Sequence, residues 1–207
     1  MTTTIRGSDN FDSASVGLQS QQVFTSSGTW TKPSGIKTIK VYITGAGSGS
    51  TNSSNAYHAG GSGGGTAIKI IDVSSISSVT VTIGSGGAST LSTTTSGAGG
   101  SSSFGSHCSA TGGAGQIWWD GGAGGVGSGG DVNLQGQGGV LTNTQGNDSS
   151  RGGDSFWGGG GAGTEANTET ARLNTIGNHG GGGGAWDQAL TTGGTGGSGI
   201  CVVEEYS

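Results

Sequence analysis

Glycine supplies 51 of the 207 residues, and in places it recurs at a fixed interval. The clearest case is the stretch GGAGGVGSGG at 121–130, where glycine returns every third residue in two overlapping sets. Three residues per turn is the repeat of polyproline II. A flexible Gly/Ser linker needs no such period. The spacing therefore predicts a packed rod of roughly 30 Å, at about 3.1 Å per residue, with a solvated linker as the alternative.

Further glycine runs interrupt the rest of the chain, at 60–65, 97–100, 158–163, 180–186 and 193–199. Ordering such segments is costly, because glycine loses more backbone entropy than any other residue. Polyproline II also has no internal hydrogen bonds, so buried peptide groups must pair between neighbouring segments. Glycine on two of the three faces of each segment would let neighbouring backbones approach closely enough to form these hydrogen bonds. The third position, occupied by Ala, Val, Ser or Thr, would then point outward.

The low charge of the chain limits the classes of protein to which it can belong. Only 9% of residues are charged and the net charge is −5, too little to keep a chain expanded, although Leu, Ile, Val and Phe number only 33. The seven Lys and Arg residues are scattered, which argues against a nucleic-acid partner. No apolar run approaches the length of a membrane span, and no secretory signal opens the sequence.

Alternating apolar and polar residues predict strands between the glycine runs. The longest are 36–45, 66–73, 78–84 and 199–206, and shorter ones are expected within 23–30 and 102–113. In the last strand, Ile200 and Val202 are expected on the inner face. The segment 164–177 lacks a steady apolar stripe and is expected to be a loop or one short turn.

The predicted fold class is therefore all-β/irregular. It combines a small antiparallel β-sandwich module with a packed bundle of glycine-rich polyproline II (polyglycine II) segments, and it has little or no α-helix. Residues 1–21 are polar and weakly patterned, so they are expected to form a connecting arm. Residues 22–207 are expected to form the glycine-rich domain.

No catalytic or metal-binding constellation is evident, and neither an enzyme nor a cofactor is expected. The three histidines, His58, His107 and His179, lie far apart in sequence and lack metal-ligand spacing. The glycine runs lack the GK[ST] of a phosphate-binding loop. Cys108 and Cys201 allow at most one disulfide, and we interpret them as small buried hydrophobes rather than a bridge.

Aromatic residues are the better candidates for function, because Trp and Tyr give large contact areas at low entropic cost. Trp30 is expected in the core, and Trp157 is interpreted as structural. Two other sites place Trp beside Asp directly next to a glycine run, where a sugar or a protein receptor could bind; the alternative is that these rings cap the bundle. The candidate receptor-binding residues are Trp118, Trp119, Asp120, Trp186, Asp187, Tyr57 and His58.

The order of the segments resembles a known family. GTWTKPSGIKTIKVYITGAGSGS, followed by GGGTAIKIIDVSSISSVTVTIGSGG, resembles the start of the glycine-rich domain of bacteriophage tail-fibre and tail-tip proteins. SSFGSHCSATGG, GVGSGGDVNLQGQGG, GGDSFWGGGGAG and GICVVEEY follow in the same order, so the resemblance covers roughly 22–206. Related phage adhesins are similar in packing polyglycine II helices, with loops at one end contacting the receptor. The longer inserts 141–151 and 164–179 depart from that pattern.

The resemblance implies a distal fibre domain in the virion, made in the host cytoplasm, that binds a bacterial surface receptor. This receptor would be a lipopolysaccharide or an outer-membrane protein. The arm would join the rest of the tail fibre, and a homotrimer is implied because such fibres are commonly trimeric. The alternative is a structural spacer without receptor contact. An ice-binding protein would need a more regular outward position than this chain has, and a polysaccharide-cleaving enzyme would need paired acids.

Overall fold

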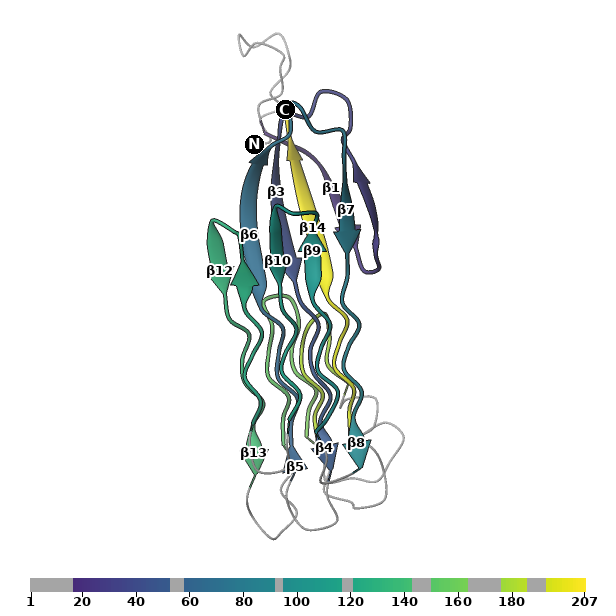
Figure 1. Ribbon diagram of the computed structural model, residues 1–207, viewed down its shortest axis with the longest axis vertical. Helices are drawn as coiled ribbons and strands as arrows, with labels where there is room; N and C mark the ends of the chain where they lie inside the picture. Colours follow the sequence, from purple (N-terminus) through teal and green to yellow (C-terminus); the bar gives the residue numbers. More distant parts are fainter. Residues whose placement is uncertain are drawn as a thin grey trace, which may run out of the picture.

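The structure is a computed structural model. Its described residues form one elongated body, with a β-sandwich at the end that holds the C-terminus, extended glycine-rich segments below it, and four short strands at the opposite end (Figure 1). We refer to that opposite end as the far end. The structure describes residues 17–52, 58–91, 95–116, 121–142, 150–163, 176–185 and 193–207.

The sandwich consists of two five-stranded antiparallel sheets. The first sheet has the order β1 (Leu18–Phe24), β14 (Ile200–Tyr206), β3 (Thr38–Thr44), β6 (Thr66–Asp72) and β12 (Val132–Leu134). The second has the order β11 (Gly127–Ser128), β10 (Cys108–Ala110), β9 (Ser102–Phe104), β7 (Ser78–Thr82) and β2 (Gly28–Thr31). The described residues contain no α-helix, so the predicted fold class is confirmed.

The hydrophobic core lies between the two sheets and follows the two-residue period of their strands. Ile39, Val41 and Ile43 of β3 are fully buried, as the alternation predicts. Trp30 fills the centre, also fully buried, with its ring 5.9 Å from that of Phe104. Both cysteines are buried free thiols, as expected, and burial raises the pKa of Cys108 to about 11.

A buried carboxylate sits at the edge of this core. Glu205 is fully buried, and it accepts hydrogen bonds from Trp30 Nε1 and Gln22 Nε2, both at 2.7 Å, and from Ser20 Oγ. These donors offset the cost of removing the carboxylate from water. The expectation that Ile200 and Val202 face inward is wrong, because Cys201, Val203 and Glu205 occupy the inner face. The apolar run ICVV lacks the alternation that would distinguish the two faces.

Below the sandwich, three glycine-rich segments form the interior of a bundle; we call 45–50, 60–65 and 180–185 the interior rods. None of their residues is exposed. The amides of Gly45 and Ser48 donate to rod 60–65, and those of Ala46 and Gly49 donate to segment 97–100. The amides of Gly47 and Ser50 donate to segment 194–197. The bonding partner thus repeats every third residue, which confirms three residues per turn.

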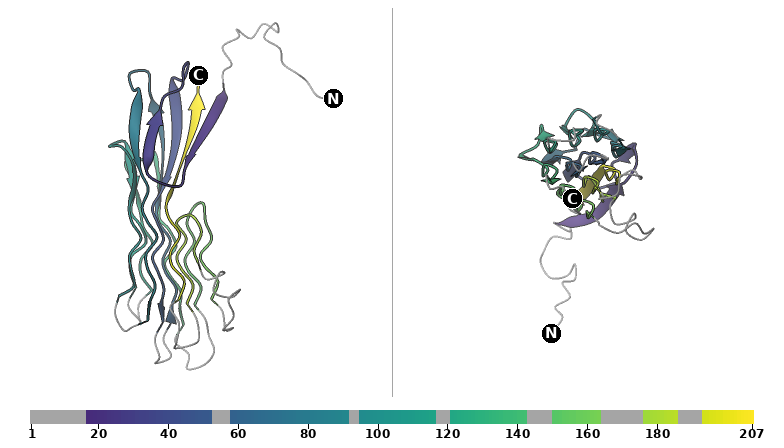
Figure 2. Two further views of the ribbon diagram at one scale, coloured as in Figure 1. Left: turned by 90° about the vertical axis from the view of Figure 1, so that its right-hand side faces the viewer. Right: turned by 90° about the horizontal axis from the view of Figure 1, so that it is seen from below.

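The interior rods bond to one another and to a surrounding ring of outer rods. Figure 2 shows these extended segments from the side, below the sandwich. Ser48 donates to Ser62, Gly61 donates to Gly183, and Gly183 donates to Ser48, so the three interior rods are mutual neighbours. Within the described part of the chain, each outer rod is hydrogen-bonded to the next one in sequence, and the last is hydrogen-bonded to the first. The outer rods are 84–89, 95–101, 111–116, 121–126, 135–140, 150–154, 158–163, 176–178 and 193–199.

The outer rods show the exposure pattern expected from their sequence. In rod 121–126, Ala123 and Val126 are exposed, whereas Gly124 and Gly125 are buried. In rod 193–199, Thr195 is exposed between buried glycines. The stretch 121–130 is a rod only as far as 126, because Gly127 and Ser128 join the sandwich as β11 and Gly129 turns the chain with φ of 73°.

Glycine is required where rods approach most closely. A Cβ built on Gly47 would lie 2.0 Å from the carbonyl oxygen of Gly181, and one on Gly61 would lie 2.1 Å from that of Ser48. Even so, Ser48 and Ser62 fit inside, because Ser48 Oγ accepts from the Ser62 amide at 2.8 Å and Ser62 Oγ donates to the Ala114 carbonyl. The interior is therefore held mainly by backbone hydrogen bonds rather than by apolar side chains.

The sequence-based boundaries differ from the structure in two places. Strand β1 begins at Leu18, so residues 18–21 of the predicted arm pair with β14. The segment 102–113 contains the antiparallel pair β9 and β10 rather than one strand. Most of the predicted loop at 164–177 lies outside the described residues.

Candidate functional site

Four short strands form a small sheet at the far end of the bundle (Figure 1). Its order is β13 (Leu141–Thr142), β5 (His58–Ala59), β4 (Thr51–Asn52) and β8 (Thr90–Leu91). Strands β4 and β8 are parallel, and the other pairs are antiparallel. Each strand continues directly from a rod, so the bundle fixes the position of this sheet.

Residues that border several other undescribed segments lie at the same end. The Ser96 amide donates to the Gln116 carbonyl at 2.9 Å, and the Ala185 amide donates to the Ser150 carbonyl at 2.7 Å. The Ser150 hydroxyl in turn donates to the His58 carbonyl at 2.6 Å. Residues far apart in sequence are thus brought together at one end. We call the four-stranded sheet, together with Ser96, Gln116, Gly121, Ser150 and Ala185, the platform. The undescribed segments that follow or precede these residues in sequence are 53–57, 92–94, 117–120, 143–149 and 186–192.

Six of the seven predicted receptor-binding residues belong to those segments and lie outside the described residues: Tyr57, Trp118, Trp119, Asp120, Trp186 and Asp187. The roles predicted for them stay predictions. Their described neighbours are Gln116, Gly121, Ala185 and His58, and these belong to the platform.

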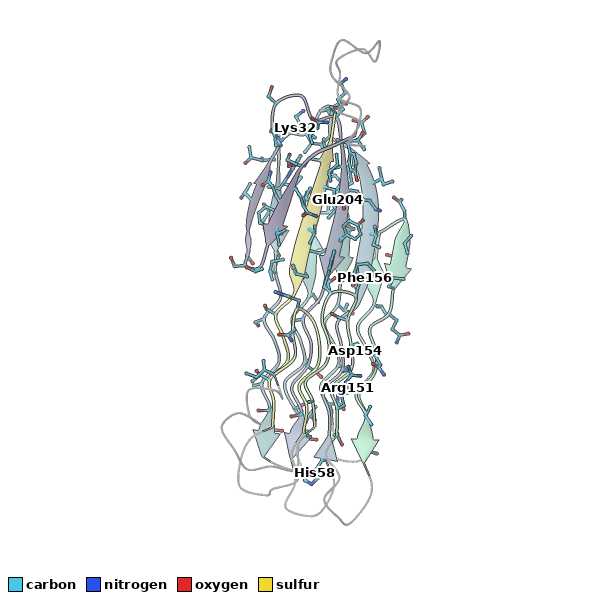
Figure 3. The ribbon with its side chains drawn as sticks, turned by 180° about the vertical axis from the view of Figure 1, so that it is seen from behind. Lys32, His58, Arg151, Asp154, Phe156 and Glu204 are labelled. Atoms are coloured by element: carbon cyan, nitrogen blue, oxygen red, sulfur yellow. The ribbon has the colours of Figure 1, made fainter. Side chains whose placement is uncertain are left out.

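The seventh predicted residue, His58, is described. It lies in β5 with only 3% of its surface exposed, and its carbonyl oxygen accepts the bond from Ser150. Its receptor-binding role also stays a prediction. In the structure, its main-chain atoms help to build the platform (Figure 3).

Some buried polar side-chain atoms at the platform have no hydrogen-bond partner. Gln116 is fully buried, and its Oε1 accepts from the Gly122 amide at 2.9 Å. Within the described part of the chain, Gln116 Nε2 and Thr51 Oγ1 are buried without a hydrogen-bond partner. Each such atom costs about 1–3 kcal/mol. In interior rods 45–50 and 60–65, by contrast, every amide donates a hydrogen bond, so the platform is the less optimised end of the bundle.

A second group of side chains was not identified from the sequence. It surrounds Tyr42 on the outer face of the first sheet, and we call Tyr42, Phe156 and Trp157 the aromatic cluster. The ring centroid of Tyr42 lies 6.1 Å from that of Phe156 and 5.6 Å from that of Trp157. Phe156 and Trp157 remain 48% and 40% exposed. The structural role predicted for Trp157 stays a prediction.

The sequence carried only a weak signal for this cluster. Phe156 and Trp157 stand between two glycine runs, as in the other Trp-containing segments, but Tyr42 is 114 positions away from Phe156 in an ordinary alternating strand. Only the return of segment 150–157 to the sandwich brings the rings together. A contact of this kind depends on tertiary structure, so periodicity could not predict it.

Other kinds of site were sought among the described residues. No group of three or more His, Cys, Asp or Glu side chains there could hold a metal ion. None of these residues belongs to a helix long and apolar enough to cross a membrane.

Comparison with protein families identifies one match that covers most of the chain. The model of a family described as a glycine-rich domain matches residues 22–206. No curated protein matches the sequence. The family match spans both the sandwich and the rods.

Proposed function

The chain belongs to the glycine-rich domain family, and we propose that it is the receptor-binding tip domain of a bacteriophage tail fibre. It would bind the host surface through the segments at the far end of its rod bundle. Trp118, Trp119 and Asp120 would provide the main contact, and Trp186, Asp187 and Tyr57 would add to it.

The observation that carries this proposal is that the two ends of the fold differ. The C-terminus and β1 lie at the sandwich end, whereas the platform of β13, β5, β4 and β8 lies at the opposite end (Figure 1). Recognition residues commonly lie on loops held by a rigid scaffold. The rod bundle meets this need, because its hydrogen bonds fix where each connecting segment begins and ends.

The resemblance to tail-fibre proteins supplies the biological setting of the proposal. The receptor would be a lipopolysaccharide or an outer-membrane protein, and the domain would bind it without cleaving it. Residues before β1 would join the remainder of the fibre in the virion. In a trimeric fibre, repeated copies of the domain would raise the avidity without new contacts.

Binding of the purified chain to intact bacteria tests this proposal. A fluorescently labelled chain would be incubated with a panel of strains, with strains stripped of surface polysaccharide and with strains lacking major outer-membrane proteins. Trp119→Ala should lower binding to the susceptible strain at least tenfold, as expected for an aromatic anchor. Val126→Ala is the matched control, because Val126 is an exposed apolar residue of an outer rod.

A structural spacer predicts a different result. It would bind none of the strains, and Trp119→Ala would have no effect. Equal binding by the wild type and by a combined Trp118→Ala, Trp119→Ala and Trp186→Ala variant, all folded by calorimetry, would rule out the proposed receptor-binding residues.

A further inference from the structure

Exposed apolar side chains gather on the outer face of the first sheet, away from the far end. Cross-strand pairing aligns Val23, Val202, Tyr42, Ile68 and Val132 in one row across this face. Val23 and Val132 at its two ends are 55% and 48% exposed, whereas Val202, between Val23 and Tyr42, is only 3% exposed. The aromatic cluster lies over the middle of this row, on Tyr42. Clustered exposed apolar surface commonly marks an interaction site.

The aromatic cluster is held in a defined arrangement. Phe156 and Trp157 occupy the two central positions of the turn 155–158, and their rings are nearly perpendicular, with centroids 5.1 Å apart. The Ser155 amide donates to the Gly158 carbonyl at 2.8 Å, and the Gly158 amide donates back to Ser155 Oγ at 2.9 Å. Ser155 Oγ also donates to the His179 carbonyl at 2.7 Å. Binding would therefore cost little ordering of these rings.

Charged and hydroxyl groups border the aromatic surface. The Tyr206 hydroxyl donates to Glu204 Oε2 at 2.9 Å, and the Tyr42 hydroxyl lies 3.4 Å from the same oxygen. Lys40 Nζ lies 4.9 Å from the centre of the Tyr42 ring. Figure 3 shows Glu204 on its strand and Phe156 below it, on the same side of the molecule. The Glu204 carboxylate, the Lys40 ammonium group and the Tyr206 hydroxyl thus lie beside the aromatic cluster.

We infer that the aromatic cluster, together with Glu204 and Lys40, is a lateral binding site for a saccharide. One face of a pyranose ring carries C–H groups that pack on Trp157 or Phe156, and its hydroxyls donate to Glu204 or accept from Lys40. A small set of polar groups around an aromatic surface is the usual composition of a small-ligand site. A purely apolar partner would remove the carboxylate and the ammonium group from water without supplying hydrogen bonds of its own, which is costly.

This site is separate from the receptor contact proposed at the far end. A fibre domain with both sites could hold a surface glycan along its side while its tip binds the receptor. The inference does not depend on the far-end contact, because every residue that carries it is described and lies at the sandwich end or at the junction with the rods.

A glycan array printed with bacterial lipopolysaccharides and capsular polysaccharides tests the inference. Any glycan retained by the wild-type chain would then be titrated as a short oligosaccharide by calorimetry. Trp157→Ala and Glu204→Gln should each weaken this binding at least tenfold. Trp157→Phe should keep most of the affinity, because it retains an aromatic face. Val126→Ala should leave the affinity unchanged, and thermal unfolding would verify that each variant is folded.

The possible results separate the lateral site from the far-end site. Weakening by Trp157→Ala but not by Trp119→Ala supports the lateral site, whatever the outcome of the cell-binding experiment. Retention of no glycan by the wild type overturns the inference. Glycan binding that Trp119→Ala abolishes and Trp157→Ala leaves intact also overturns it, because the glycan would then bind at the far end.

Discussion

Adding a single methyl group inside the rod bundle should destabilise the protein severely. In Gly47→Ala, the new Cβ would lie 2.0 Å from the Gly181 carbonyl oxygen and 2.4 Å from its carbon. Ordinary contact begins near 3.4 Å, so the two rods must separate by more than 1 Å. The atoms in the way belong to backbone, so no side-chain rotation relieves the clash.

The magnitude follows from the hydrogen bonds that such a separation breaks. The Gly183 amide donates to the Ser48 carbonyl at 3.0 Å across these two rods, and the Gly181 oxygen that the new methyl group would displace accepts from the Gly197 amide of rod 193–199 at 2.9 Å. Leaving a buried polar group unsatisfied costs about 1–3 kcal/mol. Two broken bonds therefore predict a loss of about 2–6 kcal/mol, a large part of the roughly 5–15 kcal/mol that stabilises a typical protein.

Gly159→Ala is the matched control, and it should change the free energy of unfolding in the opposite direction. Gly159 is exposed on an outer rod, and the nearest atom to its added Cβ is Asp154 Oδ1 at 3.8 Å. This substitution should stabilise the protein by about 0.4–1 kcal/mol, because it lowers the entropy of the unfolded chain. Urea denaturation would give both free energies. A Gly47→Ala variant with the same midpoint and slope as the wild type would refute the reasoning.

Three further predictions concern the sandwich. Trp30→Phe removes the donor at 2.7 Å from the buried Glu205 carboxylate and should lower the free energy of unfolding by about 2–3 kcal/mol in urea denaturation; an unchanged stability would show that the bond contributes nothing. Cys108 should not react with Ellman's reagent at pH 8 in the native state, since burial raises its pKa to about 11, and rapid labelling would contradict this burial. Because the folded pKa exceeds the unfolded value of 9.0, the free energy of unfolding should fall as the pH rises from about 9 toward 11. The Ser74 hydroxyl and amide lower the pKa of Asp72 below 3.8, so its contribution to stability should be lost as the pH falls through that lower pKa; an NMR titration giving 3.8 or higher would be inconsistent with the turn.

Much of the fold could be predicted from the sequence, because its two parts have different periods. Alternation in β3 predicted its inward face correctly, and the three-residue spacing in 121–126 predicted the exposed positions Ala123 and Val126. The inner face of β14 was predicted wrongly because four consecutive apolar residues carry no alternation. Period alone also could not distinguish interior from outer rods. In rod 45–50, glycine alternates with Ala46 and Ser48, and it is burial on all sides that sets this pattern.

The candidate sites were less accessible to prediction from sequence. A Trp beside a glycine run suggests a turn or loop, but it does not reveal which turns share an end of the bundle. The platform becomes apparent only from bonds such as Ser150 to His58, which join residues 92 positions apart. The aromatic cluster likewise depends on the contact between Tyr42 and Phe156 across the junction of sandwich and rods. Long-range contacts of this kind leave no local period in the sequence.

Native-state hydrogen exchange, measured amide by amide, would test most directly whether glycine-rich backbone forms a solid interior. Every amide from Gly45 to Ser50 donates to a neighbouring rod, at distances of 2.9–3.1 Å. These six amides should exchange only through global unfolding, with protection equal to that of β3 in the sandwich. Exchange at the rate of an unstructured peptide would contradict the rod bundle, and with it the rigid scaffold on which the proposed receptor contact depends.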